Sequence, residues 1–259
     1  MRIDPPPEPG TRYERAGNVV RALGTTNAVV FAHFTVENAD AAVAEQVAFF
    51  QSAAVDPMVA GRPSAGGTLE WKVYGHDRPP DLGTRLAAAG FEPEEPETLM
   101  VFDLREQLHG DRRAADPAIV IRRIVDASGL AEAVHAAATA FGRDAAWQAD
   151  RIERDGARLA DTAYALYAAY AGGRPVASAR TEFPPGRSFA GLWGGGTVAE
   201  YRGRGIYRAL VGIRADEARR RGYRYLRVDA RETSRPIIER LGFVALTGIV
   251  EWRRRLPPP

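Results

Sequence analysis

Apolar and polar positions in the first part of the chain alternate in patterns that predict both helices and strands. Val43, Val47 and Phe50 recur at helical spacing, so we expect residues 39–54 to form a helix with one apolar face. A strand, a helix and a strand region interrupted by two prolines should follow, at 68–74, 80–89 and 91–104.

The pattern from residue 118 onward predicts a longer and more regular series of elements. In order, it gives a strand at 118–125, helices at 130–141 and about 146–160, a hairpin of 164–171 and 175–183, a strand at 188–198, a helix at 206–221, a strand at 223–230, and a short helix from about Ser234 before a last strand. Asp126 or Ser128 is expected to cap the first of these helices.

Two segments far apart in the sequence share a local pattern. Residues 86–91 and 240–243 each combine a helix end, a glycine cap and an aromatic residue that opens a strand. With 259 residues, of which 45% are hydrophobic, the chain can form one large domain or two small ones. We therefore divide it into a poorly ordered proline-rich start, a first domain, a polar linker and a second domain: 1–10, 11–105, 106–117 and 118–256.

Composition narrows the classes of function. The formal net charge is only +2, and the arginine runs at 219–221 and 253–255 are typical of solvated element ends, so we expect no nucleic-acid partner. There is no cysteine, and the four histidines (His33, His76, His109 and His135) lack metal-ligand spacing, so no metal is expected. We find neither a signal peptide nor a membrane span, and we expect a cytoplasmic protein.

The most informative segment is Glu200-Tyr-Arg-Gly-Arg-Gly-Ile-Tyr-Arg208, which opens the helix at 206–221. Two glycines at a strand-to-helix turn let the backbone approach a ligand and turn its N–H groups outward. The first amides of a helix lack intrahelical partners, and the helix dipole is positive there. The segment therefore predicts an anion site suited to a pyrophosphate.

This segment resembles the acyl-CoA site of the GNAT superfamily of N-acyltransferases. The family pattern is Gln or Arg, two residues, Gly, one residue, then Gly or Ala, and here it reads Arg202-Gly-Arg-Gly205-Ile-Tyr207. Tyr207 departs from the small residue at the last position. The likeness extends over roughly 118–253 and implies an α/β fold, with a mixed α+β sheet whose central strands splay apart, in a tandem of two GNAT-like domains. The first domain lacks the motif, so it is either a degenerate copy or an unrelated α+β cap.

The resemblance also implies how acyl-CoA would bind. Pantetheine would pair with the backbone near Thr197 and Val198, and amides of the glycine turn would hold the pyrophosphate. The cofactor-binding residues expected on this basis are Thr197, Val198, Arg202, Gly203, Arg204, Gly205, Ile206, Tyr207, Arg208 and Ser234. The triple glycine Gly194–Gly196 is either a bulge beside the gap or a flexible strand end.

The residues of catalysis are less clear from the sequence. Many GNAT proteins have a proton-donating Tyr where this chain has Ile238, which leaves Ser234 as the nearest polar residue, either as a catalyst or as a plain helix cap. Glu182 is either the base or a surface charge. The acceptor pocket is expected to involve Phe141, Trp147 and Trp193, although Trp193 fits the core somewhat better than the pocket.

Rival explanations of the same glycines fit less well. A P-loop needs Gly-Lys-Ser/Thr, but Lys72 is the only lysine, and a disordered Arg-Gly element would repeat. A dinucleotide fingerprint would use Asp229, but Arg208 replaces its third glycine. The sequence thus predicts an enzyme that transfers an acyl group, acetyl by default, from acyl-CoA to the amine of a small molecule in a ternary complex. The alternative is a non-catalytic acyl-CoA binding or sensing protein.

Overall fold

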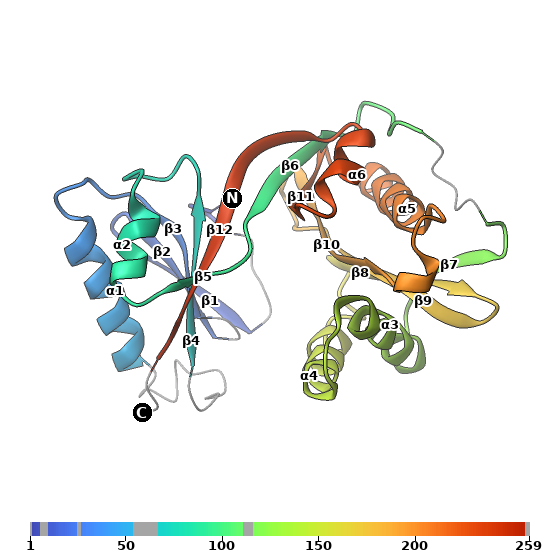
Figure 1. Cartoon of the computed structure of the whole chain (residues 1–259), viewed down its shortest axis with the longest axis horizontal. Helices are drawn as coiled ribbons and strands as arrows, with labels where there is room; N and C mark the ends of the chain where they lie inside the picture. The colour runs from blue at the N-terminus through green and yellow to red at the C-terminus, as the bar shows by residue number, and fades with distance from the viewer. Residues whose placement is uncertain (1, 6–9, 25–26, 54–66, 111–115, 257–259) are drawn as a thin grey trace. The chain divides into compact units, whose positions relative to one another are not determined.

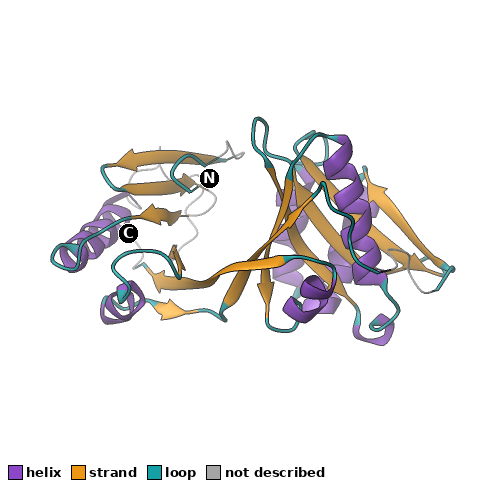
Figure 2. Ribbon diagram, turned by 90° about the horizontal axis from the view of Figure 1, so that it is seen from above, coloured by secondary structure: helices purple, strands orange, loops and turns teal. Residues whose placement is uncertain are grey.

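The computed structural model describes the chain except for residues 1, 6–9, 25–26, 54–66, 111–115 and 257–259 (Figure 1). The chain forms two compact units, Met1–Leu99 with Thr247–Pro259, and Met100–Leu246. Both combine helices with strands, as the predicted α/β class requires (Figure 2). Among the described residues, no helix has the length and apolar character needed to cross a bilayer.

The first unit is a sheet with two helices packed on one face. Its strands lie in the order β1 (Thr11–Ala16), β2 (Val19–Gly24), β3 (Asn27–Ala32), β4 (Thr68–Tyr74) and β12 (Val244–Arg255), and β5 (Glu92–Pro93) also pairs with β12. Helices α1 (Ala39–Ala53) and α2 (Leu82–Ala88) bury Phe50 and Leu86 against Val29, Leu69 and Trp71 of the strands. The helices and β4 match the sequence pattern, whereas β1, β2 and β3 were not predicted.

Strand β2 shows why these strands escaped prediction. Its residues are almost all buried, so the alternation that marks a half-exposed strand is missing. One of them is Arg21, only 4% exposed, which donates to Gln46 Oε1 at 2.6 Å and to Glu14 Oε1 at 3.1 Å.

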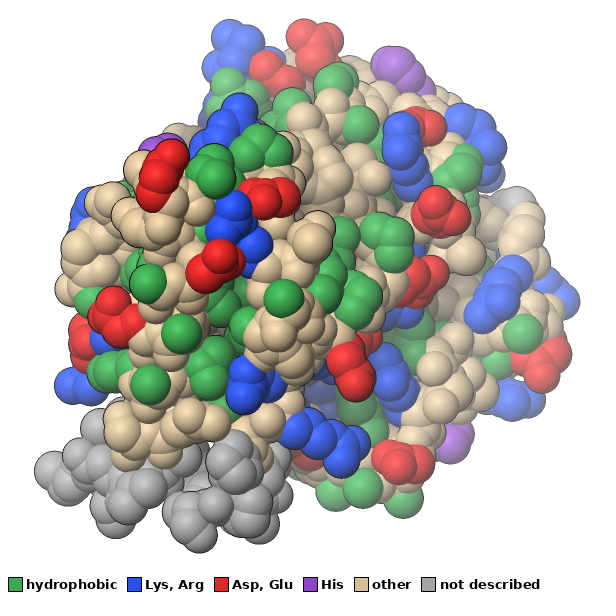
Figure 3. All heavy atoms as spheres, turned by 60° about the vertical axis from the view of Figure 1, so that its left-hand side comes forward, with side chains coloured by type: hydrophobic (Ala, Val, Ile, Leu, Met, Phe, Trp, Pro, Cys, Tyr) green, Lys and Arg blue, Asp and Glu red, His purple; other side chains and the backbone are tan. Residues whose placement is uncertain are grey.

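On the face drawn in Figure 3, acidic and basic side chains are interspersed, in keeping with the small net charge.

The second unit is a mixed sheet between two helical layers. Its strands lie in the order β6 (Glu97–Asp103), β11 (Tyr225–Arg231), β10 (Phe189–Thr197), β9 (Arg174–Glu182), β8 (Tyr164–Ala171) and β7 (Ile119–Ile124). Helices α3 (Ala127–Phe141) and α4 (Ala145–Gly156) cover one face, while α5 (Ile206–Arg220) covers the other (Figure 1). Because β7, β8, β9 and β10 are antiparallel, the unit is not the parallel sheet of a dinucleotide-binding fold.

Local signals explain where the helices of this unit begin and end. The Asp126 carboxylate accepts from the Gly129 N–H at 2.8 Å, which settles the predicted choice of cap for α3. Asp144 caps α4 in the same way through the Trp147 N–H, also at 2.8 Å. Gly142 ends α3 in the left-handed conformation, with φ of 62°.

The two units divide the chain differently from the ranges drawn on composition. Residues Ile249–Arg255 of β12 pair with β4 of the first unit, although the sequence range 118–256 grouped them with the second domain. Similarly, Met100–Asp103 of β6 lie in the second unit, ahead of the expected linker at 106–117. Composition marks loops, but it does not tell which sheet a long strand such as β12 joins.

Candidate active site

The two central strands of the second unit stay paired for only three residues. Phe189, Ala190 and Gly191 of β10 lie parallel to Tyr225, Leu226 and Arg227 of β11. Both strands continue beyond this point, β10 to Thr197 and β11 to Arg231, with no further pairs between them among the described residues. The edges of both strands are thus free of each other just before the glycine-rich turn, as expected for splayed central strands.

The triple glycine forms a bulge in β10. Its register against β9 shifts between Trp193 and Gly196, and Gly194 has φ of +54°. A Cβ at Gly194 would lie 3.0 Å from the Arg180 guanidinium, and one at Gly196 would lie 2.7 Å from the Phe141 ring. These glycines therefore leave room for specific side chains, which a merely flexible strand end would not require.

Gly195 explains the departure of Tyr207 from the family pattern. A Cβ at Gly195 would lie only 2.8 Å from Cε2 of the Tyr207 ring, so the ring packs directly on the bare backbone of the bulge. Position 207 can hold a large side chain because Gly195, on which it packs, has no side chain. Burial raises the pKa of the Tyr207 hydroxyl, and the nearby Arg214 partly offsets this.

The turn between β10 and α5 has the geometry of an anion site. Gly203 and Gly205 have φ of 77° and 73°, and Gly205 is the N-cap of α5. The Ala209 N–H donates the first helical hydrogen bond to the Gly205 carbonyl, so the amides of Ile206, Tyr207 and Arg208 precede the helical ladder. Nothing lies within 4 Å of a Cβ built at Gly203. The turn therefore presents backbone donors without crowding, at the positive end of the helix dipole.

Several groups assigned to the cofactor are already bonded within the chain. The Val198 N–H donates to the Val176 carbonyl at 2.9 Å, and the Val198 carbonyl accepts from the Tyr201 N–H at 3.0 Å. The Arg202 guanidinium donates to the carbonyls of Thr197 and Ala140, at 3.1 and 3.3 Å. Val198 thus has no free backbone group, and Arg202 ties the end of β10 to α3. By contrast, the hydroxyl Oγ1 of Thr197 is buried and makes no hydrogen bond to the described residues.

The other two arginines of the turn are held less firmly within the chain. Arg204 packs over the Tyr201 ring at 4.9 Å and lies 3.7 Å from the carboxylate of Asp116, an exposed contact that holds it weakly. Arg208, on the first turn of α5, lies beside Gly110. These two side chains remain the cations best able to add charge around the turn.

Arg214 of α5 is a candidate site residue that the sequence did not reveal. It is 1% exposed, with Nε donating to the Leu210 carbonyl at 2.8 Å and Nη1 donating to the Arg180 carbonyl at 3.1 Å. No carboxylate pairs with it in the part of the chain that the structure describes, and burial lowers its pKa to about 10. Nη2 would lie 3.6 Å from a Cβ at Gly195, so the positive charge sits under the bulge. The signal in the sequence was an arginine one turn beyond Leu210 on the apolar stripe of this helix.

The structure places the two predicted catalytic residues on different elements, Glu182 on β9 and Ser234 at the start of α6. Glu182 lies opposite Gly191, where the pairing of β10 with β11 ends, and it accepts from Arg158 at 2.8 Å. Ser234 occupies the N-cap position of α6 (Arg235–Arg240), but its hydroxyl donates back to the Arg231 carbonyl and does not cap the helix. Ile238, at the position where a tyrosine was sought, is fully buried.

A small pocket of about 40 Å³ lies on the face covered by α3 and α4. Its lining brings together Phe141 and Trp147, two of the three predicted acceptor-site residues, with Ser178 and Arg180 of β9 and Gly194 of the bulge. Trp193, the third, is not part of the lining, and its ring lies under the Arg227 guanidinium at 5.0 Å. The pocket thus reaches the bulge from the side opposite α5.

Comparisons with known proteins agree with this geometry. Residues 131–243 match the acetyltransferase (GNAT) family model, so the second unit carries a GNAT acetyltransferase domain. A search of curated proteins gives no significant match.

Solved structures resemble nearly the whole chain. A GCN5-related N-acetyltransferase from Kribbella flavida is 16% identical, with a TM-score of 0.69 over 96% of this chain and 91% of its own. One from Sphaerobacter thermophilus is 17% identical, with a TM-score of 0.63 over 95% and 82%. A tandem GNAT protein from the clavulanic acid biosynthesis pathway is 16% identical, with a TM-score of 0.61 over 98% and 86%. These likenesses confirm the predicted fold, including its tandem character.

The contact between Gly195 and Tyr207 can be tested by a double-mutant cycle. We expect Gly195→Ala to lower the free energy of unfolding by about 1–3 kcal/mol, because the new methyl group overlaps the Tyr207 ring. Tyr207→Ala should relieve much of that loss when the two are combined. Gly248→Ala, where nothing lies within 4 Å, controls for the change of backbone. Additive effects in urea unfolding would contradict the proposed contact.

The uncompensated charge of Arg214 should cost stability. Replacing buried charged groups by apolar residues of similar size is often neutral or stabilises proteins by about 1–4 kcal/mol. We therefore expect Arg214→Met to unfold in urea at the same or a higher concentration than the parent, despite losing two hydrogen bonds. Arg220→Met, at an exposed site on the same helix, is the control. A loss of more than about 2 kcal/mol would mean that the fold requires the guanidinium.

Proposed function

We propose that this protein is an acyl-CoA-dependent N-acyltransferase of the cytoplasm, with acetyl-CoA as its default donor and the amine of a small molecule as its acceptor. One observation carries the proposal, namely that the glycine turn at the start of α5 follows a stretch of β10 that is no longer paired with β11. An anion site beside two free strand edges suits a ligand that combines a pyrophosphate with an extended arm of amides.

In this proposal the donor lies along the second unit. The amides of Ile206, Tyr207 and Arg208 hold the pyrophosphate, and Arg204 and Arg208 add positive charge. The pantetheine arm pairs with β10 beyond Gly191. Since Val198 uses both of its backbone groups internally, the buried Thr197 hydroxyl is the more available partner at that end of the strand.

The chemistry requires little from side chains. A neutral amine attacks the thioester carbonyl, the C–S bond breaks, CoA leaves as a thiolate, and the proton from the amine passes to the thiolate or to water. Holding amine and thioester together can supply roughly 7–11 kcal/mol of the barrier reduction. The positive charge of Arg214 under the bulge favours the oxyanion and the thiolate that develop there.

The alternative function is a non-catalytic acyl-CoA binding or sensing protein. Two observations favour it: Ile238 replaces the proton-donating tyrosine, and Glu182 is held by Arg158. The two functions differ in turnover, since only the enzyme releases free CoA in the presence of an amine.

A thiol-release assay with acetyl-CoA and a panel of amines tests the proposed function, and Gly205→Asp is its matched control. An aspartate at the N-cap of α5 tolerates the left-handed backbone better than most residues, so the variant should fold. Its carboxylate would repel the pyrophosphate, so CoA binding by calorimetry should be lost together with turnover. Binding of CoA to this variant with parental affinity would place the phosphate site elsewhere.

No single side chain is expected to act as an indispensable base. A dedicated acid or base contributes about 10²–10⁴-fold, so Glu182→Gln and Ser234→Ala should each lower kcat by less than about 100-fold. The rate should rise with pH as the acceptor amine loses its proton, because only the neutral amine attacks. A thousandfold loss in either variant, with CoA binding intact, would identify that residue as the catalyst.

A further inference from the structure

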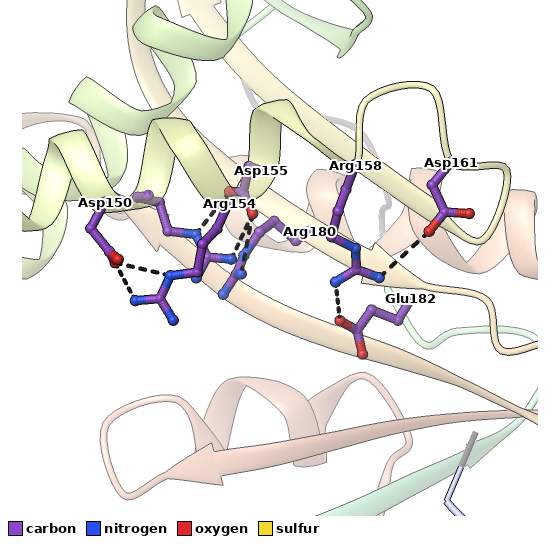
Figure 4. A network of polar contacts seen from close by, with 8 residues as sticks. Asp150, Arg154, Asp155, Arg158, Asp161, Arg180 and Glu182 are labelled. Carbon is purple, nitrogen blue, oxygen red and sulfur yellow. Dashed lines mark hydrogen bonds and ion pairs between the residues drawn. The ribbon is translucent and has the colours of Figure 1, made fainter. Parts of the chain in front are cut away.

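Arg180 holds an unusual position in the pocket between β9 and α4. Its side chain is 23% exposed and points toward α4 (Figure 4). Its guanidinium makes no hydrogen bond to any residue in the described part of the chain, and its one ion pair, Nη1 to Asp155 Oδ1, is long at 3.8 Å. The guanidinium is partly exposed and keeps donors that the acceptors of a ligand can take in place of water.

Asp155 does not neutralise Arg180, because Arg151 already binds it. Arg151 donates Nε to Asp155 Oδ2 at 2.8 Å and Nη2 to Oδ1 at 2.7 Å, the two-pronged arrangement that satisfies a carboxylate best. Asp155 is 2% exposed and is seen beside Arg180 in Figure 4. The charged residues that line the pocket are therefore two arginines and one aspartate, with one positive charge in excess.

The backbone around Arg180 keeps the guanidinium against the bulge. Gly194 has φ of +54°, and a Cβ there would lie 3.0 Å from both Nε and Nη2 of Arg180. From the other face of the sheet, Arg214 donates to the Arg180 carbonyl at 3.1 Å. Arg180 thus lies at the point where β10 leaves β11, next to the place proposed for the thioester.

The size and walls of the pocket limit what can pair with Arg180. Its volume of about 40 Å³ exceeds the roughly 10–15 Å³ that one water molecule needs, so it admits a small charged group. Apart from Ser178 and Gly194, the remaining walls are apolar: Ala133, Val134, Ala137, Phe141, Trp147 and Leu166. Phe141 is 40% exposed, so its ring can contact the part of a ligand that stays outside.

We propose that Arg180 binds a carboxylate of the acceptor, so that the substrate is an amine that also carries a carboxylate, as α-amino acids do. This inference rests on the proposed function. A planar guanidinium can bind both oxygens of a carboxylate at once, which fixes the direction in which the amine points. A carboxylate on the acyl group of the donor is the other source of the same chemistry.

The test compares α-amino acids with their carboxamides as acceptors in the thiol-release assay. The parent protein should prefer the carboxylates. Arg180→Gln should raise the KM for the carboxylates by about 10–100-fold, which is the effect expected from losing hydrogen bonds to a charged group, with little change in kcat. The carboxamides should be used equally by both proteins. Arg180→Lys should restore the affinity only in part, and Arg154→Gln, at an exposed pair on α4, should match the parent. An equal loss for both classes of acceptor, or no preference in the parent, would overturn the proposal.

A second arm uses a neutral amine with acetyl-CoA and with an acyl-CoA whose acyl group ends in a carboxylate. If Arg180→Gln changes only the choice of donor, the carboxylate belongs to the acyl group and the proposed acceptor class is wrong. If the parent shows no turnover at all, the proposed function fails, and calorimetric binding of the same amino acids and carboxamides still decides the role of Arg180. Selective binding of the carboxylates that is lost in Arg180→Gln would support it, and no selectivity would refute it.

Discussion

The glycine bulge of β10 is the constraint on which the rest of the site depends. Three consecutive residues without side chains meet three large neighbours, Arg180 and Phe141 on one face of the sheet and Tyr207 on the other. A Cβ at any of the three glycines would come within 3.0 Å of its neighbour, so the bulge, the pocket and the start of α5 are fitted to one another. The bulge lies beyond the last pair between β10 and β11, where the strands are free to bind a ligand.

The fit at Gly195 also shows how a departure from a sequence pattern can be absorbed. Tyr207 occupies a position that is small in the family pattern, yet its ring rests on a residue that has no side chain. Its backbone amide still belongs to the first turn of α5, where an anion would bind. The substitution therefore changes the space beside the turn and leaves the backbone donors of the turn in place.

The sequence predicts the features that depend on residues close together in the chain, and it does not predict those that depend on tertiary packing. The elements from residue 118 onward, the cap at Asp126 and the glycine turn depend on nearby residues, and the structure agrees with them. Strand β2 is buried on both faces and lacks alternation, and the sheet that β12 joins is decided by pairing with β4, so neither could be read locally. The same holds for Arg180 and Arg214: an arginine is expected at the surface, and only tertiary packing reveals that Arg214 is buried and Arg180 half-buried beside the bulge.

In the proposed mechanism, Arg214 and Arg180 offer a reason why the usual catalysts are missing. Arg214 lies under the bulge on the α5 face, Arg180 lies against it on the opposite face, and a hydrogen bond joins the first to the carbonyl of the second. A positive field between them disfavours a protonated amine and favours the oxyanion and thiolate that form as the thioester breaks. Such a site has less need of a base at Glu182 or an acid at position 238. The two guanidinium groups lower the pKa of the acceptor amine and of the leaving thiol, so the amine loses its proton and the thiolate leaves more easily. In the proposed mechanism, burying Arg214 without a carboxylate lowers the stability of the fold and places a positive charge where the reaction requires one.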